Sequence, residues 1–149
     1  MQISTTLHEA MTLHLIKLCV GAESIADLEE WIALRLRLSR EQIHTTRMMP
    51  KNRDEILDGG SLYWVIKGTV ACRQRILGLR GHRDEDGISR CDIVLDRTVV
   101  PVDPRPRGPF QGWRYLNAAD APPDLAGAGT PDAHLPLELQ KQLRVIGLV

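Results

Sequence analysis

The sequence is poor in aromatic residues, in cysteine and in net charge. Only six of its 149 residues are aromatic, so the position of each ring is informative. The three cysteines are an odd number without a C-x-x-C pair, which fits reduced thiols better than the disulfide framework of a secreted protein. Nineteen basic and nineteen acidic residues cancel, which excludes a polybasic or acidic tail.

Long hydrophobic runs and common catalytic motifs are also missing. The longest apolar run is far below the roughly 18 residues of a membrane span, and residues 1–10 lack the pattern of a signal peptide. No zinc-ligand spacing, G-x-S-x-G turn or phosphate-binding G-x-x-x-x-G-K-[ST] motif occurs. We therefore expect a cytoplasmic protein without cofactor, structural metal or membrane contact, in which binding is favoured over catalysis.

The hydrophobic pattern predicts alternating strands and helices in the first half of the chain. Thr12–Val20 is apolar on both faces, as in a central strand. Ser24, followed by Asp27, favours the start of a helix that extends to about Leu38. A second strand is expected over Gln42–Met49, and Pro50 favours a short helix directly after it.

A long strand is predicted from Ser61 to Leu77 because its side chains alternate with period two. Six apolar side chains are expected to face the core: Leu62, Trp64, Ile66, Val70, Cys72 and Ile76. Gly68 would form a bulge. Ile88–Val100 is the expected antiparallel return strand, and the proline-rich residues 101–109 are expected as an ordered loop or edge segment before a last strand, Phe110–Leu116.

The opposite face of the long predicted strand is basic. Residues 40–83 contain nine Lys or Arg against four Asp or Glu, an excess of five in a neutral chain. Tyr63, Lys67, Arg73 and Arg75 would share one strand face, where cations and a ring suit phosphates and unstacked bases. The alternative is a solvated sheet face whose basic side chains cover apolar surface.

A second candidate site lies in Arg105–Leu116, where arginines and aromatic residues are interleaved. Trp113 and Arg114 follow Gly112, which allows a ligand to approach closely, and rings beside guanidinium groups suit base stacking. The alternative is that these aromatic residues belong to the core. Arg47, Lys67 and Arg73 could instead hold a small anionic substrate.

Several long motifs resemble a known family. TLHLIKLCVGAESIADLEEW, TRMMPKNRDEILDGGSLYWVIKG, CRQRILGLR and PRPRGPFQGWRYL resemble a bacterial, alphaproteobacterial-type family of short single-domain proteins of unknown function. The order of a first strand, the Ser24 helix start, Arg47 and the Asp58-Gly59-Gly60 turn is also similar to the layout of the PUA-like superfamily, especially its EVE and ASCH branches. This second resemblance implies a pseudo-barrel and binding of RNA or modified nucleotides.

The expected fold is α+β: a small mixed or antiparallel pseudo-barrel with an N-terminal crossover helix, a short second helix and a C-terminal helix. Residues 1–10 would be a loose leader, 11–116 the pseudo-barrel domain, 117–134 a surface linker, and 135–149 a helix packed on the same domain. The preferred function is binding of single-stranded RNA or a nucleotide by the basic strand face. A small-molecule-binding protein or small enzyme for an anionic substrate is the alternative, and an adaptor that uses residues 101–109 is a third hypothesis.

Overall fold

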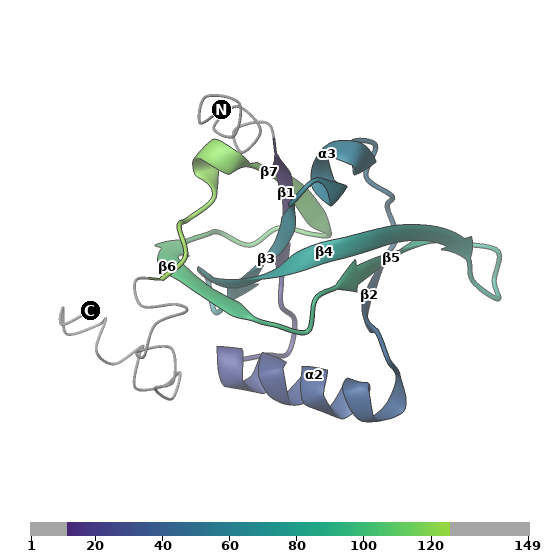
Figure 1. Ribbon diagram of the computed structural model, residues 1–149, viewed down its shortest axis with the longest axis horizontal. Helices are drawn as coiled ribbons and strands as arrows, with labels where there is room; N and C mark the ends of the chain where they lie inside the picture. Colours follow the sequence, from purple (N-terminus) through teal and green to yellow (C-terminus); the bar gives the residue numbers. More distant parts are fainter. Residues whose placement is uncertain (1–11, 126–149) are drawn as a thin grey trace.

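The computed structural model describes residues 12–125, and its core is a seven-stranded sheet with two helices (Figure 1). The elements follow the predicted order with two additional strands, because the predicted strand Ser61–Leu77 is divided in two and the proline-rich segment forms a strand. They are β1 (Leu13–Leu18), α2 (Ile25–Leu38), β2 (Gln42–Thr46), α3 (Arg53–Leu57), β3 (Ser61–Ile66), β4 (Thr69–Arg83), β5 (Ser89–Leu95), β6 (Val100–Pro106), β7 (Trp113–Asn117) and the 3-10 turn η1 (Ala118–Asp120). The predicted leader, the C-terminal helix and most of the predicted linker lie outside the described residues.

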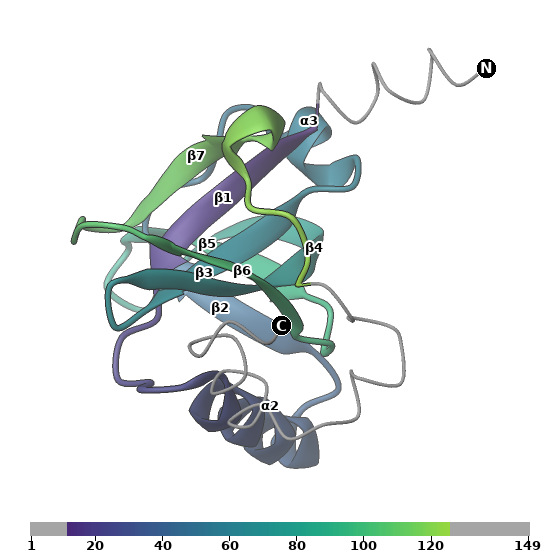
Figure 2. The same ribbon diagram turned by 90° about the vertical axis from the view of Figure 1, so that its left-hand side faces the viewer.

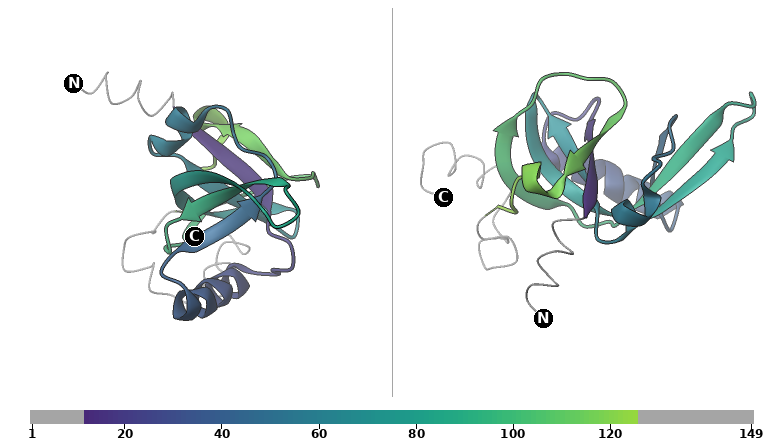
Figure 3. Two further views of the ribbon diagram at one scale, coloured as in Figure 1. Left: turned by 90° about the vertical axis from the view of Figure 1, so that its right-hand side faces the viewer. Right: turned by 90° about the horizontal axis from the view of Figure 1, so that it is seen from above.

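The strands form a strongly curved sheet that does not close. Its order is β2-β5-β4-β3-β1-β7, with β6 paired to β4 off this path. All pairs are antiparallel except β1 and β3, which are parallel and are joined by the crossover that contains α2. Figures 2 and 3 show α2 beneath the curved sheet and the β4–β5 hairpin extending away from it. The fold is thus the expected small α+β pseudo-barrel.

Helix α2 begins where the sequence predicts. The Ser24 side chain accepts a hydrogen bond from the backbone N–H of Asp27 at 3.1 Å. The Asp27 carboxylate accepts in return from the N–H of Glu23 at 3.0 Å, so two of the unpaired donors at this helix end are satisfied. The helix then buries Ile25, Leu28 and Ile32 against the sheet.

Both faces of the central strands are buried in separate clusters. The larger cluster lies on the α2 side and includes Leu15, Trp64 and Ile93. The smaller one lies on the opposite face and is formed by Ile16, Tyr63, Val65, Val70, Val102 and Leu116. The prediction that β1 is apolar on both faces is therefore confirmed, because each face meets a different cluster.

The predicted strand Ser61–Leu77 is in fact a hairpin of two strands. Lys67 and Gly68 both have positive φ angles, 50° and 74°, the left-handed conformation that a tight two-residue hairpin turn needs. The turn and a bulge between Val70 and Cys72 change which face of the sheet each following side chain points to. Val70 therefore belongs to the smaller cluster. The prediction of a bulge at Gly68 and of one continuous strand face was wrong for this reason.

The proline-rich segment is an edge strand. Residues Val100–Pro106 form β6 and pair antiparallel with β4, with Pro101 opposite Cys72 and Pro106 opposite Thr69. Proline is tolerated there because an edge strand has one side whose backbone needs no ladder partner. The predicted return strand accordingly ends early, at Leu95. The chain beyond β7 also stays on the domain, since Val102 bridges Asp124 and Leu125 is 9% exposed.

Trp64 is a critical core side chain, and its truncation tests the predicted packing. It is 4% exposed, and its Nε1 donates to Gln74 Oε1 at 2.9 Å. Trp64→Ala is expected to lower the free energy of unfolding by about 3–5 kcal/mol, measured by urea denaturation. Leu38→Ala, at an 85% exposed helix position, is the control and should change it by roughly 0.5 kcal/mol or less. Equal effects of the two variants would contradict this packing.

His14 makes the fold sensitive to acid. Its Nδ1 accepts a hydrogen bond from the Ser61 N–H at 3.0 Å, and burial, with a contribution from Arg73, lowers its pKa to about 4. The unfolded chain therefore binds more protons than the folded one between about pH 6.5 and 4, so stability falls as the pH decreases through that window.

The test compares urea midpoints of the wild type and His14→Asn between pH 7 and pH 4. Asparagine keeps an acceptor but does not titrate, so the variant should lose less stability over this range. His44, treated below, adds a loss of the same sign in both proteins. An identical pH dependence of the two proteins would show that His14 is not a source of the acid sensitivity.

Candidate functional site

Arg73, the central cation of the predicted basic face, is held in an ion pair. Its Nε and Nη2 donate to the two carboxylate oxygens of Asp124, both at 2.8 Å, and its Nη1 donates to Ser61 Oγ at 3.1 Å. This bidentate pair fixes the segment after η1 to β4. The Asp124 carboxylate neutralises the positive charge of Arg73, which the sequence predicts to bind a ligand.

The two rings of the predicted site are buried. Tyr63 is 4% exposed in the smaller cluster, and Trp113 is 9% exposed in the larger one. Trp113 Nε1 donates to the carbonyl of Met48 at 2.8 Å, so its polar edge is also satisfied. For Trp113 the structure therefore shows the alternative drawn from the sequence, a core position. For Tyr63 the sequence alternative was a solvated strand face, and the buried ring was not predicted. Tyr115, for which a core position was also considered, is 40% exposed.

The remaining predicted residues are exposed and come from different parts of the fold. Lys67 lies in the β3–β4 turn, with its Nζ 3.6 Å from a Glu23 carboxylate oxygen. Arg114 donates to the carbonyls of Gln111 and Trp113. Arg47 follows β2, and Arg75 is on β4 opposite Ser61. Lys67 therefore does not share a strand face with Arg73 and Arg75, and ligand binding by these residues stays a prediction.

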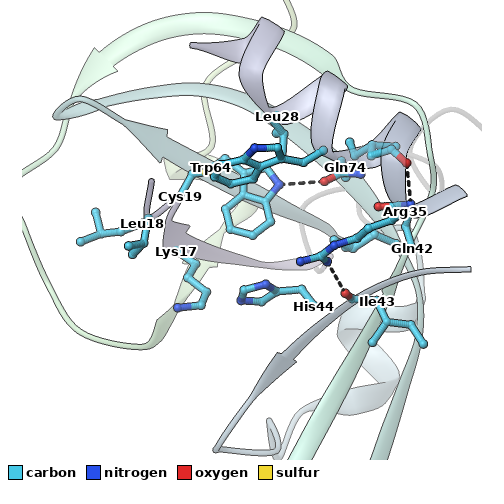
Figure 4. A pocket seen from close by; sticks show the side chains of 14 residues that line it. Lys17, Leu18, Cys19, Leu28, Arg35, Gln42, Ile43, His44, Trp64 and Gln74 are labelled. Carbon is cyan, nitrogen blue, oxygen red and sulfur yellow. Dashed lines mark hydrogen bonds between the residues drawn. The ribbon is translucent and has the colours of Figure 1, made fainter. Parts of the chain in front are cut away.

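A different set of side chains forms a partly enclosed pocket of about 160 Å³ between α2 and the sheet (Figure 4). We call it the α2–β2 pocket. It is bounded by the end of β1, the inner face of α2, strand β2 and the indole of Trp64. Its lining residues are Lys17, Leu18, Cys19, Val20, Leu28, Trp31, Ile32, Arg35, Gln42, Ile43, His44, Trp64, Gln74 and Leu95. None of the seven residues that the sequence nominated is among them.

Two cations face this pocket without an acidic partner. Strand alternation places Lys17 on the face of Leu15 and Cys19, beside Trp64 in the parallel β1–β3 pair. Arg35, in the last turn of α2, donates from Nη1 to the carbonyl of Ile43 at 2.8 Å. Among residues 12–125, no carboxylate lines the pocket or forms an ion pair with either cation.

His44 is a neutral ring held between these cations and Trp64. Its ring packs edge-on against the Trp64 indole, with centroids 5.1 Å apart and an interplanar angle of 89°. Burial, followed by the charges of Lys17 and Arg35, lowers its pKa to about 4. Its Nε2 is buried and has no hydrogen-bond partner in the described part of the chain. Such an unpaired buried atom is uncommon in folded proteins.

The amide side chains at the back of the pocket are held by hydrogen bonds. Gln74 accepts from Trp64 Nε1 and donates to the carbonyl of Asp96 at 2.8 Å. Gln42 donates to the carbonyl of Ile32 at 3.1 Å, which ties β2 to the helix. A buried network with satisfied partners holds the surrounding side chains in one arrangement.

The pocket does not present an activated nucleophile. Burial raises the pKa of the Cys19 thiol to about 11, so the reactive thiolate is scarce at neutral pH. His44, the ring that could act as a base, has no carboxylate to orient it within residues 12–125. The geometry therefore suits binding better than covalent chemistry.

The sequence did contain a signal for this pocket. Lys17 is a single charge within a strand that is otherwise apolar on both faces, and a lone cation at such a position must reach either solvent or a polar cavity. His44 and Arg35 carry no comparable local signal. Their approach depends on β2 folding back along α2, which no spacing in the sequence specifies.

The fold and the pocket together define a small α+β pseudo-barrel protein with a cationic cavity under its crossover helix. The chain belongs to a family of proteins of unknown function, DUF1489, whose model matches residues 15–149. The match confirms the expected membership of an uncharacterised family. It also extends beyond the quoted sequence motifs to the C-terminal residues. No curated protein and no solved structure matches the chain.

Two further findings concern residues 12–125 only. Neither helix in this range is long and apolar enough to cross a membrane. No group of three or more His, Cys, Asp or Glu side chains in the same range is arranged to hold a metal ion.

The electrostatic coupling within the pocket can be measured directly. Lys17→Ala removes a cation that disfavours the imidazolium form, so the pKa of His44 should rise from about 4. It should stay below 6.5 because burial is the larger cause. An NMR pH titration of the His44 ring gives the value, with Arg37→Ala, an exposed cation elsewhere on α2, as the control. An unchanged pKa in Lys17→Ala would contradict the placement of Lys17 beside His44.

Proposed function

We propose that this protein binds a small anionic ligand in the α2–β2 pocket. The observation that carries the proposal is the pair of cations, Lys17 and Arg35, which face one partly enclosed cavity with no carboxylate lining it in the described residues. Charges that converge without a counter-charge repel one another, and this repulsion is relieved when an anion enters. The neutral His44 beside them adds no positive charge of its own and packs edge-on against Trp64.

The chemistry of the two cations supports an oxyanion. A guanidinium presents several donors in a flat fork that matches phosphate and carboxylate oxygens, and an ammonium adds a compact charge. Arg35 uses Nη1 on the Ile43 carbonyl, which fixes the group at the pocket while other donors stay available. Arg35 is an exposed residue at the rim of the pocket, and hydrogen bonds between its guanidinium and a charged acceptor are stronger than those between neutral groups.

The sequence-based hypothesis of RNA or nucleotide binding is retained as a proposal with less support. Arg47, Arg75 and Arg114 are exposed and could contact phosphates, but the rings of Tyr63 and Trp113 are buried and Arg73 is paired with Asp124. The layout resemblance to the PUA-like superfamily, the bacterial origin and the cytoplasmic location likewise stay proposals. A small anion requires none of the buried rings, so the α2–β2 pocket is the better-supported site.

The test is calorimetric titration of the full chain with inorganic phosphate at low salt. The wild type should bind, and the Lys17→Ala/Arg35→Ala double variant should bind at least about tenfold more weakly, since each charged hydrogen bond contributes about 1.5–3 kcal/mol. Arg37→Ala/Arg40→Ala is the matched control, because it removes two exposed cations from the same end of α2 without touching the pocket. Thermal unfolding of all three proteins checks that each is folded.

The outcomes separate the hypotheses. Absence of phosphate and sulfate binding by the wild type would refute the small-anion proposal. Equal binding by both double variants would place the anion elsewhere. A short single-stranded RNA forms a second arm: if it binds and Arg47→Ala/Arg75→Ala weakens it while Lys17→Ala/Arg35→Ala does not, the basic surface is the site.

A further inference from the structure

We propose that the ligand of the α2–β2 pocket carries one planar ring directly next to its anionic group, and that Trp31 stacks on this ring. The inference rests on the proposed function and names its ligand class, an anionic compound with a single aromatic or heteroaromatic ring. Four features of the pocket support it, and each concerns a different property: the exposure of Trp31, its fixed position, its distance from Arg35, and the size of the cavity.

The first feature is the exposed fraction of the Trp31 side chain, which is high compared with those of its neighbours on α2. Its neighbours on the inner face of α2, Leu28 and Ile32, are each 6% exposed, whereas Trp31 is 39% exposed and still lines the pocket. An indole has the largest apolar surface of any side chain, so leaving its face in water sacrifices stability that packing could supply. A ligand ring that covers this face would recover that burial.

The second feature is that Trp31 already packs against the chain between β1 and α2 without any ligand. Gly21 has a φ angle of 91°, and a Cβ atom at this residue would lie 3.1 Å from Trp31 Cη2. The ring therefore packs closely on the backbone between β1 and α2, at a residue where only glycine fits without strain. A stacking surface that is already held in place loses little conformational entropy on binding.

The third feature is that Trp31 and Arg35 lie on the same side of one helix. The two residues are four apart on α2 and both line the pocket, so their Cβ atoms are about 5–6 Å apart. A ring over Trp31 and an anionic group joined to it would therefore meet both residues at one site. This placement favours a ligand whose ring and charge are close together.

The volume and lining of the cavity limit the ring to one. The pocket measures about 160 Å³, close to the roughly 150 Å³ of an engineered protein cavity that binds benzene. Leu18, Leu28 and Leu95 supply apolar wall, which a bare inorganic ion would leave facing water. A cavity with apolar walls and a few convergent polar groups is typical of small organic ligands.

The experiment compares phenyl phosphate with inorganic phosphate, two ligands of similar charge at neutral pH. Phenyl phosphate should bind the wild type on the order of tenfold more tightly, which is the size expected for one stacked ring. Cyclohexyl phosphate, similar in size but not planar, should gain less. Trp31→Leu should remove most of the advantage of phenyl phosphate while leaving the affinity for inorganic phosphate within about twofold.

Leu34→Ala serves as the matched variant, because Leu34 is 56% exposed on α2 and does not line the pocket. It should leave both affinities unchanged. If phenyl phosphate binds no better than phosphate, the inference fails while the proposed function stands. If neither ligand binds, the proposed function itself fails. If Trp31→Leu weakens both ligands equally, Trp31 shapes the cation site and does not stack on a ring, which also overturns the inference.

Discussion

The architecture depends on the length of one strand, β4, which runs for 15 residues and pairs with three others. Its first part pairs with both β3 and β6, and its second part with β5. A strand shared in this way must bend, and the bulges at Val70/Cys72 and Ile76/Gly78 provide the bend. Because β5 in turn carries β2, this curvature brings His44 back towards α2 and creates the pocket.

The polar side chains around the pocket fall into two sets. One set consists of amides with hydrogen-bond partners within the protein, and the other consists of ionisable groups. Gln42 and Gln74 are 5% and 1% exposed; Gln42 donates to a backbone carbonyl, and Gln74 bonds to a backbone carbonyl and the Trp64 indole. By contrast, His44 Nε2 has no hydrogen-bond partner in the described residues, and no carboxylate among them lines the pocket beside Lys17 and Arg35. The bonded amides hold the wall of the pocket in one arrangement beside the two cations.

Most of the local structure could be predicted because it depends on neighbours in the sequence. The Ser24 cap, the inner stripe of α2, the helix after Pro50 and the burial of Trp64 follow from short-range spacing, and the structure confirms them. The errors come from residues where a turn interrupts a regular pattern. In the sequence, Lys67 and Gly68 do not interrupt the period-two pattern on either side of them. In the structure they form a turn that reverses the chain, so the strand faces predicted for Lys67 and Val70 were wrong.

The sequence by itself determined the α+β class and most of the order of the elements, because hydrophobic periodicity and caps act within a few residues. The uncharacterised family and the pseudo-barrel were expected from the resemblance of long motifs and of their layout. Only the tertiary structure decided which charged residues lie together. Arg73 became a structural ion pair because the distant Asp124 folds back onto it, while Lys17, Arg35 and His44 from three separate elements came to share one pocket. Electrostatic interactions depend on distance in space, and the register and curvature that set these distances involve strands far apart in the chain.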